Sequence, residues 1–184
     1  MKRVLYIRHG QSETNLRGIF AGGLDNLALT ELGRDQARQA ALEIKAQKIK
    51  VDKIITSPLY RTQETAKIVA GVIGFDDGKI IVDPRFKEYD IGENNIPVKG
   101  MTAAKMMSLP NREDPMLFAK RVRQGLKAIT NKEGTTLILG HAGVGRMIEC
   151  LRRERNPSEF YDIPGYPNGH VVELDLSWLD GSKS

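Results

Sequence analysis

The sequence lacks the features that would place the protein in a secreted or membrane class. Its single cysteine, Cys150, cannot form a disulfide within the chain, which favours a reducing compartment. No apolar run approaches the length that spans a bilayer. Only four apolar residues follow the basic start before Arg8 interrupts them, too few for a secretory signal. We therefore expect a cytoplasmic protein that does not associate with membranes.

The sequence also lacks a concentrated patch of one charge. The net charge is +5, but the 28 basic residues are spread along the whole chain. The densest basic cluster, residues 152–155, is interrupted by Glu154 and has no interleaved aromatic side chains. A nucleic-acid surface usually shows both features. We therefore expect no nucleic-acid partner. The net positive charge instead favours the binding of small anions.

Candidate strands alternate with amphipathic helices along most of the chain. In one such helix, Thr30 is a good N-cap and the apolar residues Ala37, Ala40, Ala41 and Ile44 recur at helical spacing. We expect strands at residues 2–7, 51–56, 79–82, 135–139 and 171–176, and helices at 30–48, 57–72, 102–108, 116–130 and 144–153. This alternation predicts one α/β domain over residues 1–184, a three-layer α/β/α sandwich with a mostly parallel, mixed central sheet.

Three polar clusters follow candidate strands of this sheet. His9 follows the first strand, Ser57 to Arg61 follow the second, and His141 follows the strand at residues 135–139. Ligands bind beyond the carboxyl ends of the strands in such sheets. We therefore expect the three clusters to meet at one edge.

The residue types at this edge favour an anionic ligand. Arg8 supplies a fixed fork of donors that suits phosphate, and Gly10 allows a ligand to approach the backbone. Arg61 lies in the first turns of a helix, whose free N–H groups and dipole favour anions. His141, flanked by glycines, repeats the pattern of His9.

Other chemistries lack the sequence motifs that they need. Two histidines beside two arginines make a poor metal site, and no H-E-x-x-H motif or Cys/His cluster supplies further ligands. There is no G-x-S-x-G motif and no Walker A loop, which argues against a serine hydrolase and an NTPase. We therefore predict no metal and no cofactor, and a nucleophilic histidine acting on phosphate.

These residues also carry a family resemblance. "RHGQSETN" resembles the signature of the histidine phosphatase superfamily, which includes the cofactor-dependent phosphoglycerate mutases. Four further stretches are similar to family motifs in the same order: "GLDNLALTELGRDQA", "TSPLYRTQETA", "LGHAGVGRMI" and "YPNGHVVEL". The resemblance covers most of the chain and implies a phosphoglycerate mutase-like fold.

The resemblance implies a role for each matching residue. His9 matches the nucleophile that becomes a phosphohistidine, and Arg8, Arg61 and His141 match the residues that hold the phosphate oxygens. Substrate contacts are implied for Asn15 and for the main chain at Ala21, Gly22 and Ala142.

A general acid is needed to protonate the leaving alkoxide. Glu88 is the candidate, because "RFKEYDIGENN" is similar to the E-x-x-x-G stretch of the family. Asp90 and Glu93 are nearby alternatives. Beyond Gly92 the sequence has Asn94-Asn95-Ile96, where many members carry Trp-Glu-Gly.

Three functions fit these motifs: a metal-independent phosphomonoesterase, a phosphoglycerate mutase and a phosphate-binding module without turnover. The short segment between Glu88 and Thr135 favours the phosphatase, since the mutases carry a larger insertion there. The resemblance implies that specificity comes from a variable cap at about residues 83–114. Basic residues in this cap hint at an anionic metabolite: Arg85, Lys87, Lys99, Lys105 and Arg112. We expect a small phosphorylated substrate and a monomer or homodimer.

Overall fold

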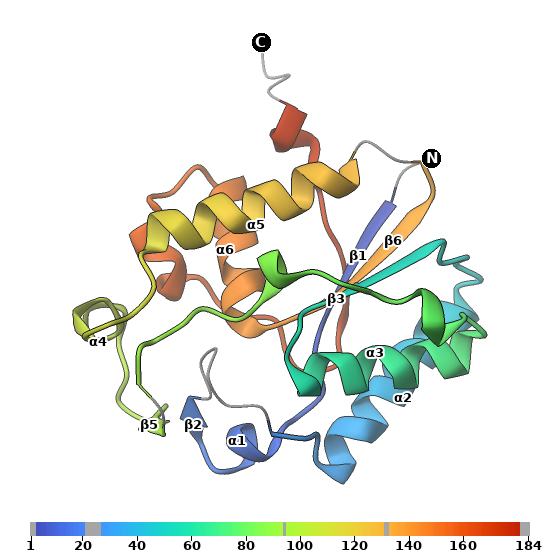
Figure 1. Cartoon of the computed structure of the whole chain (residues 1–184), viewed down its shortest axis with the longest axis horizontal. Coiled ribbons are helices and arrows are strands. Elements are labelled where there is room, and N and C mark those ends of the chain that lie inside the picture. Colours follow the sequence, from blue (N-terminus) through green and yellow to red (C-terminus); the bar gives the residue numbers. More distant parts are fainter. Residues whose placement is uncertain (1–2, 21–26, 94, 131–132, 181–184) are drawn as a thin grey trace.

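A five-stranded sheet runs through the centre of the computed structural model, which describes residues 3–20, 27–93, 95–130 and 133–180 (Figure 1). Its strands lie in the order β4-β3-β6-β1-β7, and β7 alone is antiparallel to its neighbour. The strands are β1 (Arg3–Arg8), β3 (Lys53–Thr56), β4 (Ile81–Val82), β6 (Thr135–Gly140) and β7 (Val171–Glu173). A separate antiparallel pair joins β2 (Ile19–Phe20) to β5 (Ile96–Pro97).

Helices cover both faces of the central sheet. Figure 1 shows α5 and α6 on one face and α2 and α3 on the other, which confirms the three-layer α/β arrangement. The helices are α1 (Glu13–Leu16), α2 (Glu31–Ala46), α3 (Tyr60–Ile73), α4 (Ala103–Ser108), α5 (Pro115–Thr130) and α6 (Ala142–Arg152). Short 3-10 turns lie at Asp77–Lys79, Pro84–Phe86, Pro157–Asp162 and Ser177–Asp180. None of the helices within the described residues is both long enough and apolar enough to cross a bilayer.

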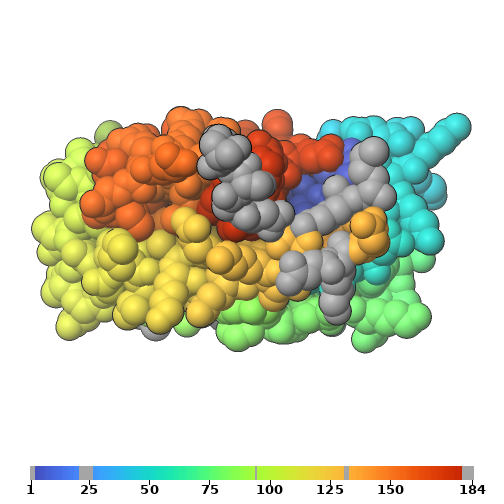
Figure 2. All heavy atoms as spheres, turned by 90° about the horizontal axis from the view of Figure 1, so that it is seen from above, coloured from blue at the N-terminus to red at the C-terminus, as the bar shows by residue number. Residues whose placement is uncertain are grey.

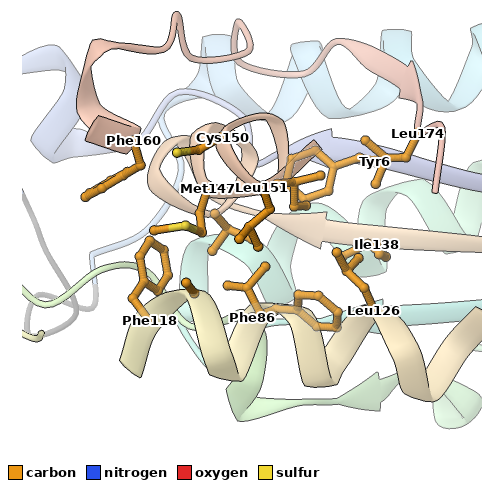
Figure 3. Close-up of a cluster of buried hydrophobic side chains, with 14 of the residues drawn as sticks. Tyr6, Phe86, Phe118, Leu126, Ile138, Met147, Cys150, Leu151, Phe160 and Leu174 are labelled. Carbon is orange, nitrogen blue, oxygen red and sulfur yellow. The ribbon is translucent and has the colours of Figure 1, made fainter. Parts of the chain in front are cut away.

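The two faces of the sheet bury different side chains because successive residues of a strand point in opposite directions. In β1, Val4 and Tyr6 pack on the α5–α6 side, and Leu5 and Ile7 pack on the α2–α3 side. Figure 3 shows the larger of these cores, where side chains of α5 and α6 meet in front of the sheet. The strands that carry the site therefore lie between two close-packed cores, which hold their ends in place.

Several boundaries differ from those that the sequence predicts, most by one or two residues, and two of them are informative. Helix α3 begins at Tyr60 rather than at Pro58, because the Ser57 hydroxyl accepts the Leu59 N–H at 3.2 Å in a turn before the helix. The last strand ends at Glu173, although apolar residues alternate as far as Leu176. The N-cap at Thr30 is confirmed, since its hydroxyl accepts the Gly33 N–H at 3.0 Å.

The segment that contains α4 lies at one end of the long axis of the molecule. In Figure 2 this segment is yellow-green, and residues near the end of α2 (cyan) form the opposite end. The central sheet lies between them in Figure 1. The part of the predicted cap around α4 therefore stands beside the sheet, whereas Phe86, Tyr89 and Ile91 of its first part are buried in the core.

Candidate active site

The register of the parallel strands brings the two site histidines together. Arg8 is paired with Gly140 in the ladder between β1 and β6, so His9 and His141 follow at the same level. The His9 N–H donates to the Gly140 carbonyl at 3.0 Å, and the two imidazole rings lie 5.3 Å apart, edge to face. The predicted meeting of these residues at the carboxyl edge of the sheet is what the structure shows.

The hydrogen bonds of His9 fix the nitrogen that can react. Its Nδ1 lies 2.7 Å from the Gly10 carbonyl, which can only accept, so Nδ1 carries the proton. Nε2 is then left with a lone pair, and it accepts the Arg61 Nε–H at 3.2 Å. Burial, followed by the charges of Arg61 and Arg8, lowers the pKa of His9 well below its usual range. His9 is therefore held neutral with Nε2 as its nucleophilic atom.

Arg8 and Arg61 place positive charge around this nitrogen. Arg61 is almost completely buried in the first turn of α3. Arg8 ends β1 and donates from Nη1 to the Tyr166 carbonyl at 3.0 Å. Its Nε is buried and has no hydrogen-bond partner within the described part of the chain. Unpaired buried donors are uncommon, and an anion bound here would satisfy this one.

His141 is held from two sides. Its Nε2 lies 2.8 Å from the Ser57 hydroxyl, and its carbonyl accepts the Tyr6 hydroxyl proton at 2.7 Å. Its Nδ1 is buried and lacks a partner among the described residues. Burial, with the nearby charge of Arg61, lowers the pKa of His141 well below its usual range. Because the Ser57 oxygen already accepts the Leu59 N–H, its own proton can go to Nε2, which would leave Nδ1–H as a donor.

Ser57 belongs to one of the polar clusters that the sequence places at this edge, but the sequence assigns no role to its side chain. The structure places the Ser57 hydroxyl against Nε2 of His141. The position of Ser57 in the chain explains this contact, because Ser57 directly follows β3, and β3 is the neighbour of β6. The Ser57 N–H donates to the Leu139 carbonyl at 3.3 Å, which continues the ladder to the same edge.

The carboxylate of Glu88 lies against the first turn of α6. Its carboxylate accepts the Tyr89 N–H at 2.8 Å and the Gly143 N–H at 3.2 Å. A Cβ at Gly143 would come within 2.3 Å of this carboxylate, so only glycine permits the approach. The alternative carboxylates lie elsewhere: Asp90 accepts the Gly92 N–H, Glu93 is exposed, and neither lines the cavity. Of the three candidates, Glu88 alone lines the cavity with His9.

A cavity of about 240 Å³ opens beside His9. Its inner wall, as we define it, is made by Arg8, His9, Asn15, Arg61 and Glu88. Asn15 Oδ1 accepts the Ser12 N–H at 3.2 Å and lies 3.4 Å from Asn168 Nδ2, which leaves the NH₂ group of Asn15 as a donor.

Ala142 also lines the cavity, whereas His141 lies behind His9 and is fully buried. The predicted contacts at Ala21 and Gly22 lie outside the described residues.

The outer wall of the cavity is mostly apolar. We define it by the side chains that lie away from the strand ends: Ile19, Phe20, Tyr89, Ile91, Val98, Met106, Phe160, Tyr161 and Arg146. They come from β2, from residues 89–106, from the turn Pro157–Asp162 and from α6. Sequence reasoning did not single out Arg146, although it lies inside the "LGHAGVGRMI" stretch.

The basic residues of the predicted cap do not line this cavity. Arg85 pairs with Asp83 at 2.6 Å, Arg112 donates to the Met107 carbonyl at 2.7 Å, and Lys105 donates to the Gly100 carbonyl at 3.0 Å. Their charge therefore gives no support to the idea that the cap itself recognises an anion.

The structure shows why position 10 requires a glycine, and the reason differs from the predicted one. We expect it to leave room for a ligand, yet a Cβ at Gly10 would lie 2.1 Å from the Gly33 carbonyl oxygen. The loop after β1 therefore packs directly on the first turn of α2. Among the described residues, no group of three or more His, Cys, Asp or Glu side chains is arranged to hold a metal.

Comparisons with known proteins identify the family of the chain. The sequence pattern of the histidine phosphatase superfamily (branch 1) matches residues 4–178. The chain is 34% identical to "Putative phosphoserine phosphatase 2" of Hydrogenobacter thermophilus, over 100% of this chain and 93% of that protein. It is 32% identical to the 2,3-bisphosphoglycerate-dependent phosphoglycerate mutase of Thermoplasma acidophilum, over 96% and 88%.

The fold has the same support. A solved mycobacterial glucosyl-3-phosphoglycerate phosphatase superposes with a TM-score of 0.76 at 20% identity, over 95% of this chain and 90% of that one. This likeness supports the phosphoglycerate mutase-like α/β fold.

Proposed function

The chain belongs to the histidine phosphatase superfamily, and from that membership we propose that it is a metal-independent phosphomonoesterase. Its substrate is a small phosphorylated metabolite, and its intermediate is a phosphohistidine at His9. The observation that carries the proposal is the state of His9, which is neutral and buried beside two arginines with Nε2 unprotonated.

In the first step, Nε2 of His9 attacks phosphorus in line with the bond to the leaving oxygen. Phosphoryl transfer depends mainly on positioning and on stabilising charge on the equatorial oxygens. We assign this task to Arg8, Arg61 and the NH₂ group of Asn15, which line the cavity with His9. Arg61 donates to Nε2 in the structure, so bound phosphate must take over that hydrogen bond before attack.

The leaving alkoxide needs a proton, which we assign to the Glu88 carboxyl group. The P–O bond breaks as the N–P bond forms, and the proton moves from Glu88 to the alkoxide oxygen. In the second step, Glu88 accepts a proton from water as the water oxygen attacks phosphorus. His9 leaves with its lone pair, and inorganic phosphate is released.

Phosphoglycerate mutase activity is the second candidate, because several curated relatives carry that name, including ones that match nearly the whole chain. The same inner wall serves both reactions, and the difference lies in how well water is excluded from the phosphohistidine. The outer wall includes the two-residue strand β2 and the six-residue helix α4. We propose that a wall of such short elements admits water to the phosphohistidine, which favours hydrolysis.

A panel of phosphomonoesters tests the proposal in the presence of a chelator at neutral and acidic pH. We expect phosphate release that the chelator does not reduce, and an acid-labile, base-stable phosphoenzyme in quenched samples. Loss of activity in the chelator would contradict the metal-free mechanism. Transfer between the positions of phosphoglycerate without net hydrolysis would establish the mutase, and phosphate binding without turnover would establish the binding module.

A further inference from the structure

Two of the stretches that carry the family resemblance contain a polar side chain with no part in the proposed reaction steps. Thr65 lies in "TSPLYRTQETA", and Asn168 lies in "YPNGHVVEL". Neither residue lines the cavity beside His9. Both nevertheless form hydrogen bonds with the backbone at His9 and Gly10, although Thr65 comes from α3 and Asn168 comes from the segment before β7.

The two side chains hold opposite ends of one peptide group. Nδ2 of Asn168 donates to the His9 carbonyl at 2.7 Å, and the Gly10 N–H donates to the Thr65 hydroxyl at 3.2 Å. This carbonyl and this N–H belong to the peptide bond between His9 and Gly10, which is planar. Fixing the carbonyl at one end and the N–H at the other therefore fixes the orientation of the whole plane.

The orientation of this plane matters because the His9 ring bonds to the next carbonyl of the chain. Nδ1 of His9 lies 2.7 Å from the Gly10 carbonyl, and this contact keeps the proton on Nδ1 and leaves Nε2 free to attack. The backbone from the Cα of His9 to the Gly10 carbonyl passes through the held peptide group. A rotation of the plane would therefore lengthen or break the contact that sets the tautomer.

Thr65 ties this peptide group to the helix that carries Arg61. Its side chain is fully buried in α3, one turn after Arg61. The Thr65 hydroxyl uses its one proton to donate to the Arg61 carbonyl at 2.7 Å, so it can only accept from the Gly10 N–H. Nε2 of His9 accepts the Arg61 Nε–H at 3.2 Å. The same turn of α3 therefore holds both the ring and the backbone of the nucleophile.

Asn168 ties the peptide group to the opposite side of the loop. Its NH₂ group has two hydrogens, one for the His9 carbonyl and one directed toward Oδ1 of Asn15, which lies 3.4 Å from Nδ2. The next residue, Gly169, packs directly on α2, since a Cβ there would lie 2.7 Å from the Cβ of Gln36. The segment that presents Asn168 therefore has a fixed support of its own.

We propose that Thr65 and Asn168 are positioning residues that hold the nucleophile through the peptide group between His9 and Gly10. They act by keeping Nε2 of His9 unprotonated and in line with phosphorus, without touching the substrate. This inference rests on the proposed phosphatase function and adds two residues to its first step. A misplacement of a reacting atom by about 1 Å can cost about 10²-fold in rate. Loss of either residue should therefore slow the attack and leave substrate binding almost unchanged.

Two variants of Asn168 test its hydrogen bond apart from its shape. Asn168→Asp keeps the size of the side chain, but a carboxylate only accepts hydrogen bonds and repels the His9 carbonyl. In single-turnover measurements with excess enzyme, release of p-nitrophenol from p-nitrophenyl phosphate reports the attack by Nε2. We expect Asn168→Asp and Asn168→Ala to lower the saturating rate constant about 10- to 100-fold and to change the half-saturating enzyme concentration by less than about threefold.

Asn156→Ala is the matched control for these variants. Asn156 also uses its side chain to hold a turn, since its Oδ1 accepts the Ser158 N–H at 3.0 Å, and it does not line the cavity. This variant loses a hydrogen bond of the same kind elsewhere in the fold. It should therefore keep the wild-type rate constant within about twofold.

Variants of Thr65 test the other end of the peptide group. Thr65→Val removes the hydroxyl and leaves the buried Gly10 N–H unpaired, so we expect the same loss in the rate constant as for Asn168→Ala. Thr65→Ser keeps the hydroxyl and should retain the wild-type rate constant within about threefold. In the double variant of Thr65→Val and Asn168→Ala, the loss should be smaller than the product of the single losses, because both residues hold one group. If Thr65→Val does not fold, the two Asn168 variants decide the question.

Each other outcome overturns the proposal. A wild-type rate constant in Asn168→Asp would show that the hydrogen bond to His9 has no effect on the attack. A change confined to the half-saturating concentration would show that the residues shape phosphate binding instead. Losses that multiply in the double variant would show that Thr65 and Asn168 do not act through one peptide group.

A separate measurement distinguishes failure of this proposal from failure of the proposed function. If the wild type releases no p-nitrophenol, the proposed function fails, and NMR of the ring nitrogens of His9 then decides on the positioning residues. We expect a single tautomer with the proton on Nδ1 in the wild type and a mixture of tautomers in Asn168→Asp. Identical spectra for the two proteins would overturn the proposal.

Discussion

The two walls of the cavity are built in different ways. The inner wall comes from the end of β1, from α1, from the start of α3 and from Glu88, next to two buried cores. The outer wall comes from β2, from residues 89–106, from a 3-10 turn and from α6. Chemistry needs atoms held in place, and a parallel sheet supplies such positions at its carboxyl edge. The outer wall can change without disturbing those positions, which suits it to the choice of substrate.

The walls also differ in how their polar groups are satisfied. Around His9, backbone and side-chain groups fix a single tautomer and leave Arg8 Nε and His141 Nδ1 unpaired within the described chain. On the outer wall, Arg146 is the main polar feature. The unpaired polar atoms therefore lie at or next to the inner wall, and the outer wall contributes mainly apolar contact.

Replacing the nucleophile should give the largest effect. His9→Ala removes the attacking nitrogen while Arg8 and Arg61 remain, so we expect kcat to fall by about 10⁴-fold or more. Steady-state phosphate release and the loss of the quenched phosphoenzyme measure it. His170→Ala, at an exposed position, is the control and should keep wild-type kcat. If His9→Ala still releases phosphate, His9 is not the nucleophile. The inner wall would then not be the site of the chemical step.

The general acid should give the next largest effect. Glu88→Gln keeps the shape of the side chain but cannot protonate the alkoxide, so we expect kcat to fall about 10²- to 10⁴-fold with an alkyl phosphate. The loss should be smaller with p-nitrophenyl phosphate, because its leaving group needs little protonation.

Glu93→Gln is the matched control, since Glu93 is an exposed carboxylate of the same segment outside the cavity. It should retain kcat within about twofold of the wild type. If Glu93→Gln or Asp90→Asn lowers kcat as much as Glu88→Gln does, that other carboxylate is the general acid. The proposed role of Glu88 would then be wrong.

Part of the inner wall could be predicted from periodicity, because Arg8, His9 and Arg61 follow candidate strands whose carboxyl ends share one edge of a parallel sheet. Asn15 and Glu88 were implied only by the family resemblance. The adjacency of β1 and β6, which brings His9 to His141, is known only from the structure. The contact between Ser57 and His141 could not be predicted, because the sequence places both residues at this edge but does not give the distance between their side chains.

The outer wall could not be predicted because its members lie far apart in the sequence. Phe20, Met106 and Tyr161 meet only after the chain has folded, and no short pattern links them. The basic residues of the cap misled for a related reason. Arg85 and Arg112 find partners within their own segment, Asp83 and the Met107 carbonyl, which composition alone does not reveal.

Low pH should reduce the free energy of unfolding through the two buried histidines. Burial keeps the pKa of both His9 and His141 well below the unfolded value of about 6.5, so the unfolded chain binds protons first as the pH falls. The free energy of unfolding should be highest above about pH 6.5. It should then decrease by up to about 1.4 kcal/mol per pH unit for each histidine.

Denaturant unfolding between about pH 5 and pH 7 measures this slope, in a range where few other groups titrate. His141→Asn should lose about half of it. A stability that stays constant from about pH 6.5 to pH 5 would contradict the view that burial holds both histidines neutral.

The smallest effect should come from the outer wall. Phe20 lies half-buried on β2, with its ring 6.0 Å from that of Tyr161, and it contributes apolar contact but no reacting group. Phe20→Ala should raise KM for p-nitrophenyl phosphate about three- to tenfold, as expected for the loss of roughly 1 kcal/mol of apolar contact, and leave kcat within about twofold. Leu117→Ala, an exposed position outside the cavity, should change neither constant. If Phe20→Ala lowers kcat and leaves KM unchanged, β2 helps to place the reacting atoms, and the division between a chemical wall and a selective wall does not hold.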